Sequence, residues 1–250
     1  MTLTDDQLDR YARHIILREI GGAGQARLLR AHVAVVGAGG IGSPAIQYLA
    51  AAGVGRLTVI DDDRIELSNL QRQTLFGSHQ IGEAKVAGAA AAARTLNPDV
   101  TVVARGERLT AANAPALLTG CDVVLDGTDN FATRLAVADA AHALRIPLVS
   151  AAIAQFEGQL AVFWGWEPDR PCYRCFVGGD PGREAASCAE EGVLGAMAGV
   201  MGSLAALEVL RAIVPFGSDI AGRLLIVDAL DFRFRTLALP KDPGCPGCGG

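Results

Sequence analysis

Residues 32–42 read HVAVVGAGGIG, an apolar run that passes directly into a cluster of glycines. Gly37, Gly39 and Gly42 fit the pattern G-x-G-x-x-G, with a predicted strand before it and a predicted helix after it (41–52, IGSPAIQYLAAA). The first glycine permits a tight turn, the second lets the backbone approach a phosphate, and the third packs the helix against the strand. Because the amino end of a helix attracts anions, this stretch predicts a nucleotide-binding turn.

The alternation of strand and helix continues on the carboxyl side of this turn. Further strands are predicted at RLTVID (56–61), VTVVA (100–104), DVVLD (122–126) and IPLVSA (146–151), and further helices at 82–96, 110–119 and 131–144. Repeated units of this kind form a mainly parallel sheet covered by helices on both faces. Residues 31–151 therefore predict a Rossmann-like α/β fold.

The segments outside this region have a different pattern. Residues 1–30 predict an amphipathic helical arm that is broken at Gly21-Gly22. After Ala151 we expect a loop from Glu167 to about Glu191, a long apolar helix, and antiparallel strands at GQLAVFWGW (158–166), RLLIVDA (223–229) and FRFRTLAL (232–239). No flexible linker interrupts the chain, so residues 1–250 predict one domain, with an arm (1–30), a nucleotide-binding half (31–151) and a second half (152–250).

Composition narrows the classes of function. The chain has 250 residues, half of them hydrophobic, and a net charge of −5, which argues against a general nucleic-acid-binding protein. The charged amino-terminal residues do not resemble a signal peptide. The longest apolar stretch, 193–207, is shorter than the roughly 18 residues of a membrane span and predicts a buried helix. We expect a cytoplasmic protein with no membrane partner.

Charged residues follow the predicted strands in an order that suits a nucleoside triphosphate. Asp61 ends the second strand and is the first choice to accept hydrogen bonds from ribose hydroxyls, with Asp62 and Asp63 as alternatives. Arg72 and Lys85 come next and could reach phosphates. Asp129, after the fourth strand, could hold Mg²⁺ through its carboxylate. An NAD-dependent oxidoreductase would use the glycine turn and Asp61, and would leave these cations without a role.

Four of the six cysteines form two Cys-x-x-Cys pairs, Cys172 with Cys175 and Cys245 with Cys248. Together they supply the four thiolates of a closed tetrahedral zinc site, and they predict a structural zinc knuckle rather than disulfides. The long interval between the pairs means that folding must bring them together. Cys121 precedes a predicted buried strand and is expected in the core.

Several segments resemble one family over nearly the whole chain. RYARHIILREIGGAGQ, GAGGIGSP, SNLQRQTLF, GEAK and GTDN are similar to the adenylyltransferases that act on molybdopterin-synthase and thiamine sulfur carriers, relatives of the ubiquitin-activating enzymes. The resemblance implies a homodimer in which Arg13 reaches the nucleotide of the neighbouring subunit. It also supports zinc at the cysteine pairs. Including the glycine turn, the expected nucleotide-binding residues are Gly37, Gly39, Gly40, Gly42, Asp61, Asn69, Arg72, Lys85, Asp129 and Asn130.

The resemblance implies a specific reaction, in which MgATP adenylates the C-terminal glycine of a small ubiquitin-like carrier ending in Gly-Gly and releases pyrophosphate. The small subunit of molybdopterin synthase is favoured as the carrier, and the thiamine-pathway carrier is the alternative. A third hypothesis is that the protein is a non-catalytic zinc scaffold that binds a ubiquitin-like partner. Residues 152–250 would bind the carrier and the zinc. A sulfurtransferase or a cysteine desulfurase is a candidate further partner, and the sequence does not identify the sulfur donor.

Cys188 lies in a polar, glycine-bearing segment (DPGREAASCAEEG), where a thiol could be exposed. In some members of the family this position takes part in thioester or persulfide chemistry, so Cys188 is a candidate catalytic residue with Arg13, Arg72, Lys85 and Asp129. Glu190 and Glu191 would raise the pKa of a nearby thiol, which argues against an activated thiolate. The alternative is a cysteine in a loop that covers the tail of the carrier.

Overall fold

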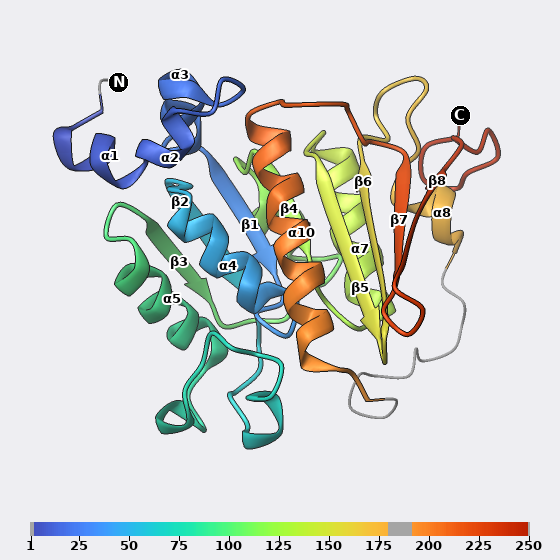
Figure 1. Ribbon diagram of the computed structural model, residues 1–250. Coiled ribbons are helices and arrows are strands. Elements are labelled where there is room, and N and C mark those ends of the chain that lie inside the picture. The colour runs from blue at the N-terminus through green and yellow to red at the C-terminus, as the bar shows by residue number, and fades with distance from the viewer. Residues whose placement is uncertain (1–2, 180–191, 250) are drawn as a thin grey trace.

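The computed structural model describes residues 3–179 and 192–249, and its centre is one eight-stranded sheet (Figure 1). The strand order is β3-β2-β1-β4-β5-β6-β7-β8, with parallel pairing from β3 to β5 and antiparallel pairing from β5 to β8. The strands are β1 His32–Val36, β2 Arg56–Ile60, β3 Thr101–Arg105, β4 Val123–Asp126, β5 Leu148–Ala154, β6 Glu157–Phe163, β7 Arg223–Asp228 and β8 Arg233–Ala238. The expected Rossmann-like sheet with an antiparallel continuation is confirmed.

Helices cover both faces of this sheet. One face carries α3 (Gly21–Leu28), α4 (Gly42–Ala51), α5 (Lys85–Leu96) and α10 (Gly195–Ile213), and the other carries α6 (Ala114–Leu118), α7 (Phe131–Ala143) and α8 (Tyr173–Val177). Alternate strand residues serve the two cores: Val33 and Val35 of β1 pack with α4, whereas Ala34 and Val36 face the side of α7. The sheet is therefore buried on both faces at its centre.

Four boundaries differ from the sequence-based expectations. Gly21 begins α3 with φ of +60° instead of breaking a helix. The helix expected over 110–119 shortens to α6, because the Asn113 side chain accepts a hydrogen bond from the Thr110 N–H at 2.7 Å and holds the preceding residues in a turn. β6 ends at Phe163, before the two tryptophans, and the loop expected after Glu167 contains α8.

The long apolar helix is also longer than expected. α10 spans 19 residues and is long and apolar enough to cross a membrane by length and composition alone. It lies along α4, β5 and β6, where Met201 and Val209 are fully buried (Figure 1). These contacts are those of a core helix, which agrees with the sequence-based prediction of a buried helix.

The amino-terminal arm consists of α1 (Asp5–Arg10), α2 (Ala12–Ile15) and α3, and it packs at the amino ends of the strands. The Tyr11 hydroxyl accepts a hydrogen bond from Asn97 Nδ2 at 2.8 Å, and Asn97 lies just before β3. The Tyr11 ring rests so closely on Gly53, just before β2, that a Cβ at Gly53 would lie 2.6 Å from the ring. The arm is thus anchored at the end of the sheet opposite the glycine turn.

The glycine turn permits an unusually close backbone contact. Gly37 has φ of +88°, and a Cβ placed on Gly42 would lie 1.9 Å from the Gly37 carbonyl oxygen. Only glycine at position 42 therefore lets α4 begin against the end of β1.

We expect Gly42→Ala to lower the free energy of unfolding by about 1–3 kcal/mol, the usual cost of inserting a methyl group into a filled space. Gly199→Ala is the matched control, because Gly199 lies within α10 and a Cβ there meets no atom within 4 Å; this variant should be neutral or slightly more stable. Urea unfolding of both variants measures the difference. Equal midpoints for Gly42→Ala and the unsubstituted protein would contradict the packing argument.

Candidate active site

A polar cavity lies at the carboxyl ends of β1, β2 and β4 and has a volume of about 280 Å³. In this sheet the chain moves outward from β1 to β3 and then returns to β4, so β1 and β4 flank the point where the strand order reverses. Open α/β sheets bind ligands at this point. The cavity is lined by Gly37, Gly39, Gly40, Ile41, Asp61, Asp63, Arg64, Glu66, Asn69, Arg72, Gln73, Lys85, Gly127, Thr128, Asp129 and Ile153.

Three of the four predicted glycines line this cavity, namely Gly37, Gly39 and Gly40. A Cβ at Gly40 would lie 3.2 Å from the methyl group of Ala198, so the turn is closely packed against α10. Gly42 lies behind the turn, where it permits the close contact described above. The turn leads into α4, whose amino end begins beside the cavity, an arrangement that favours a bound anion.

Asp61 ties the second strand to the glycine turn. Its Oδ2 accepts a hydrogen bond from the Ala38 N–H at 2.7 Å, and its Oδ1 accepts one from the Asp63 N–H at 2.8 Å. Burial raises the pKa of Asp61, and the Lys85 ammonium and these N–H groups act in the opposite direction. Asp62 instead forms an exposed ion pair with Arg108 at 3.0 Å, outside the cavity lining. The geometry favours Asp61, and leaves Asp63 as a second acid in the cavity.

Both predicted cations line the cavity. Lys85 is 5% exposed, and its Nζ lies 2.7 Å from Oδ2 of Asp63. Arg72 lies just after the short 3₁₀ helix η1 (Leu67–Asn69) and donates a hydrogen bond to the Ser68 carbonyl at 3.1 Å. Asn69 is 8% exposed and lines the cavity beside them. The two cations can offset part of the charge of a bound polyphosphate, and the Asn69 amide can donate a hydrogen bond to it.

Asp129 completes the cavity from the loop that follows β4. Its side chain is exposed, and its carboxylate accepts no hydrogen bond from the residues that the structure describes. The neighbouring Asp126 is only 1% exposed and is fully engaged, since it accepts hydrogen bonds from the Thr128 N–H, the Thr128 hydroxyl and the Ser150 hydroxyl. Asn130 does not line the cavity. Its side chain caps α7 by accepting a hydrogen bond from the Thr133 N–H at 2.9 Å.

Sequence reasoning missed several lining residues, of which Gln73 is the most informative. Gln73 is 3% exposed, and its Oε1 has no hydrogen-bond partner in the part of the chain that the structure describes. A buried acceptor of this kind at a cavity wall is available to a ligand. The only sequence signal was its place in SNLQRQTLF, one of the segments that carry the family resemblance. Arg64 and Glu66, also missed, come from the turn before η1.

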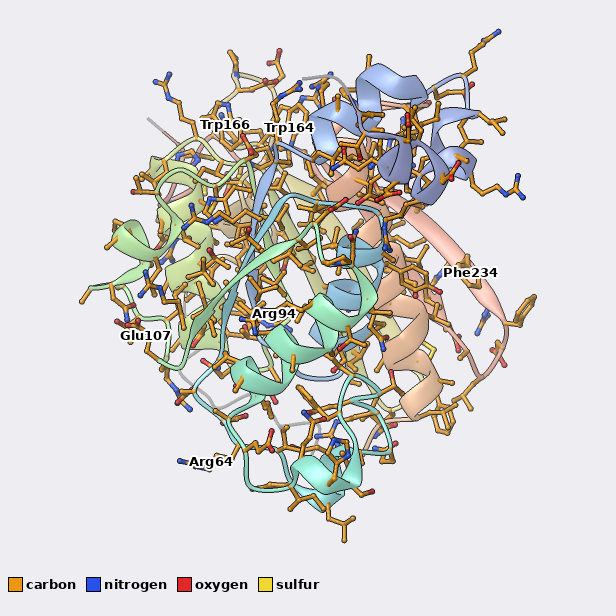
Figure 2. The ribbon with its side chains drawn as sticks, turned by 90° about the vertical axis from the view of Figure 1, so that its left-hand side faces the viewer. Arg64, Arg94, Glu107, Trp164, Trp166 and Phe234 are labelled. Carbon is orange, nitrogen blue, oxygen red and sulfur yellow. The ribbon has the colours of Figure 1, made fainter. Side chains whose placement is uncertain are left out.

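Two predicted catalytic residues do not lie in this cavity. Arg13 is exposed on α2, which lies at the opposite end of the sheet (Figure 1). Figure 2 shows the same two ends of the molecule, with Arg64 of the cavity toward the bottom and the arm, Trp164 and Trp166 toward the top. Cys188 lies outside the residues that the structure describes.

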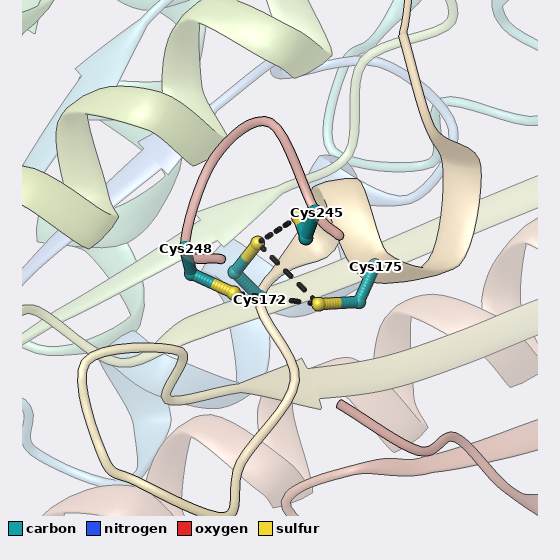
Figure 3. Close-up of side chains that lie close together, drawn as sticks. All are labelled: Cys172, Cys175, Cys245 and Cys248. Carbon is teal, nitrogen blue, oxygen red and sulfur yellow. Dashed lines mark hydrogen bonds between the residues drawn. The ribbon is translucent and has the colours of Figure 1, made fainter. Parts of the chain in front are cut away.

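The two cysteine pairs meet, as their spacing predicted (Figure 3). The four Sγ atoms lie within 4.8 Å of one another, with separations of 3.5 Å between Cys172 and Cys245 and 3.4 Å between Cys175 and Cys248. Four ligands at the usual Zn–S distance of roughly 2.3 Å stand about 3.8 Å apart in a tetrahedron, so the cluster is compatible with zinc. The Gly247 N–H points at Cys245 Sγ, 3.4 Å away, as expected around a thiolate ligand.

Comparison with known proteins agrees with this geometry. The ThiF family model matches residues 11–247. A sulfur carrier protein adenylyltransferase of Thermus thermophilus is 48% identical over 255 residues, which cover 100% of this chain and 93% of the relative. The molybdopterin-synthase adenylyltransferase of Escherichia coli is 41% identical over 247 residues, which cover 99% of this chain and 98% of the relative.

A solved structure of E. coli MccB with MccA has the same fold. Its TM-score is 0.83 at 19% identity, over 99% of this chain and 76% of that one. This likeness extends over both the parallel and the antiparallel parts of the sheet. From its sequence, its fold and its relatives, the chain belongs to the ThiF family and is an adenylyltransferase.

Proposed function

We propose that this enzyme uses MgATP to adenylate the C-terminal glycine carboxylate of a small ubiquitin-like sulfur-carrier protein. The observation that carries the proposal is the meeting of the glycine turn, Asp61, Arg72, Lys85 and Asp129 around one cavity. The favoured carrier is the small subunit of molybdopterin synthase, and the thiamine-pathway carrier is the alternative. Support for the carrier class comes from the names of the two relatives.

The chemistry needs charge neutralisation more than proton transfer. A C-terminal carboxylate is ionised at neutral pH, so no general base is required for its attack on the α-phosphorus of ATP. The attack forms a carboxylate–phosphate anhydride and breaks the bond between the α-phosphorus and the bridging oxygen, so that pyrophosphate leaves. Lys85 and Arg72 are the groups that would offset the repulsion between the two anions, and Asn69 and Asp61 would orient the nucleotide.

We assign Mg²⁺ to Asp129. Carboxylate oxygens suit this hard cation, and the free carboxylate of Asp129 contrasts with that of Asp126, whose oxygens are already used within the protein. When bound with ATP, the ion would supply positive charge near the phosphates. The protein's contribution is to hold the Asp129 loop beside the glycine turn.

Replacement of Lys85 or Asp129 by Ala should lower ATP–pyrophosphate exchange by about a hundredfold or more, the scale expected when a charge-stabilising group is removed. Cys188→Ala should leave exchange near the unsubstituted value, because this step needs no thiol. Arg108→Ala is the matched control, since Arg108 is an exposed cation paired with Asp62 outside the cavity.

The exchange is measured with saturating carrier, and a carrier without its terminal glycine is the blank. Full exchange activity in Asp129→Ala would contradict the assignment of Mg²⁺ to Asp129. Loss of exchange activity in a folded Cys188→Ala protein would contradict a direct attack of the carrier carboxylate on ATP.

We also propose that Cys172, Cys175, Cys245 and Cys248 hold one structural zinc ion. The sulfur separations support this, and so does the position of the two pairs, which join the chain end to the start of α8. Such a site would fasten residues 241–249 to the rest of the chain. Together with the single continuous sheet, it supports our view that residues 1–250 form one adenylation domain.

Metal analysis of the purified protein should find one zinc per chain, and Cys248→Ser should lose the metal and unfold at a lower urea concentration, because metal binding adds to the free energy of folding. Cys121→Ala is the control, since Cys121 is buried outside the cluster and should retain zinc. A metal-free protein with four free cluster thiols and undiminished stability would contradict the assignment.

We propose that the enzyme is a homodimer in which Arg13 acts in the neighbouring subunit's site. Arg13 lies on α2, at the end of the sheet away from its own cavity, so it needs a second chain to reach a nucleotide. The arm and α10 also present apolar side chains to solvent, with Ile16 73% and Leu207 41% exposed, as an uncovered interface would. We expect the dimer to be cytoplasmic, with a sulfurtransferase or a cysteine desulfurase acting on its product.

Mixing Arg13→Ala with Asp129→Ala should restore activity. In a mixed dimer one site lacks both groups, whereas the other has its own Asp129 and the partner's Arg13. With free subunit exchange, about a quarter of full activity should return. The measurement is carrier-dependent pyrophosphate exchange before and after mixing. If activity stays absent although exchange of subunits is demonstrated, Arg13 does not act across the interface.

A further inference from the structure

The side chain of Arg134, on α7, is directed at the backbone next to the cavity. Its guanidinium donates hydrogen bonds to the carbonyl oxygens of Thr128 and, at 3.3 Å, Ala151. Burial acts to lower the pKa of Arg134, and Asp126, Tyr173 and Asp129 together more than offset this effect, so the pKa is raised and the group is a permanent cation. A half-buried cation that bonds a carbonyl of the loop after β4 and a carbonyl of the neighbouring β5 holds this loop against the strand.

Thr128 is held from both sides. Its N–H and hydroxyl donate to Oδ1 of Asp126, at 3.1 and 2.7 Å, while its carbonyl accepts from Arg134. Every polar group of this residue therefore has a hydrogen-bond partner within the protein. Asp129 is the next residue, and its own carboxylate is free. The position of that carboxylate depends on how firmly Thr128 is held.

A second neighbour of Arg134 is Tyr173, the first residue of α8, the helix that begins after Cys172 and contains Cys175. Arg134 and Tyr173 line one cavity together with Thr128 and Asp129, and Tyr173 is 4% exposed. Burial raises the pKa of Tyr173, and the nearby Arg134 guanidinium acts in the opposite direction. The Tyr173 ring packs edge-on against Phe163 at 5.5 Å, which fixes the direction of the hydroxyl. Tyr173 directly follows Cys172, so the cysteine cluster is connected through Tyr173 and Arg134 to the Asp129 loop.

We propose that Arg134 is a positioning residue that holds the Asp129 carboxylate at the cavity, and that Tyr173 keeps Arg134 in place. The inference rests on the proposed function, in which Asp129 acts at the phosphates. Arg134 suits this task because a planar guanidinium can bond two carbonyls at once, which a lysine ammonium does less well.

The first test follows the loop itself and needs no catalysis. In Arg134→Met, backbone hydrogen exchange of residues 127–130 should become about tenfold faster or more, while β1 and α4 keep their protection. Tyr173→Phe should give a smaller change in the same segment. Arg174→Met is the matched control. Arg174 lies on α8 next to Tyr173 and pairs with Asp139 of α7 at 2.6 Å, without touching the loop.

The second test is a double-mutant cycle in pyrophosphate exchange. Arg134→Met should lower kcat by about tenfold to a hundredfold and raise the Mg²⁺ concentration needed for half-maximal rate, with little change in KM for the carrier. Adding Arg134→Met to Asp129→Ala should cost less than about twofold more, since both act through one carboxylate. Arg134→Lys keeps the charge and should recover part of the loss, even if the methionine variant folds poorly.

Unchanged hydrogen exchange at residues 127–130 in Arg134→Met would overturn the inference. Multiplied losses in the double variant would also overturn it, as would a rise in the carrier KM alone, which would place Arg134 in contact with the carrier. If the unsubstituted protein shows no carrier-dependent exchange, the proposed function fails, and the hydrogen-exchange comparison still decides whether Arg134 holds the loop.

Discussion

The contact between Gly42 and the Gly37 carbonyl is the constraint on which the rest of the site depends. A side chain at position 42 would collide with that carbonyl, so glycine alone lets α4 start directly beside the end of β1. The amino end of the helix then faces the cavity, and the Ala38 N–H is free to donate to Asp61 at 2.7 Å. Through this bond the ends of β1 and β2 keep one geometry, and Lys85 and Arg72 follow from the next turns of the chain.

Much of the nucleotide side could be predicted because its signals are local. The glycine turn, the acid that ends the next strand and the cations after it occur in chain order, and a parallel sheet brings strand ends to one edge. Gln73 was missed because a single amide beside Arg72 has no distinctive pattern. Arg134 was missed for a different reason: its partners, Thr128 and Ala151, are carbonyls, and any residue could supply them.

Helix boundaries were predicted less well where side chains compete with the backbone. Asn113 shortens α6, because its side chain accepts a hydrogen bond from the Thr110 N–H. The helix α8 forms in a segment whose sequence predicts a loop, and it begins directly after Cys172 of the cluster. α10 extends beyond its apolar stretch to Ile213, since Glu208 and Arg211 pair at 2.8 Å and continue the helix. In each case the helix boundary is set by a side-chain contact, which the spacing of hydrophobic residues does not reveal.

The two halves of the sheet carry different sites, and Tyr173 and Arg134 lie between these sites. The parallel half forms the nucleotide cavity, and the antiparallel half carries the cysteine cluster. Tyr173 directly follows Cys172 of the cluster and lines one cavity with Arg134, so the proposed positioning of the Asp129 loop would connect the two halves. Mass spectrometry of a Gly-Gly-ended carrier, after incubation with the enzyme and MgATP, shows whether the carrier carboxylate attacks ATP at this cavity. We expect a carrier heavier by one adenylyl group, formed only when its terminal glycine is present. An unmodified carrier, together with tight binding of NAD and weak binding of ATP, would contradict it.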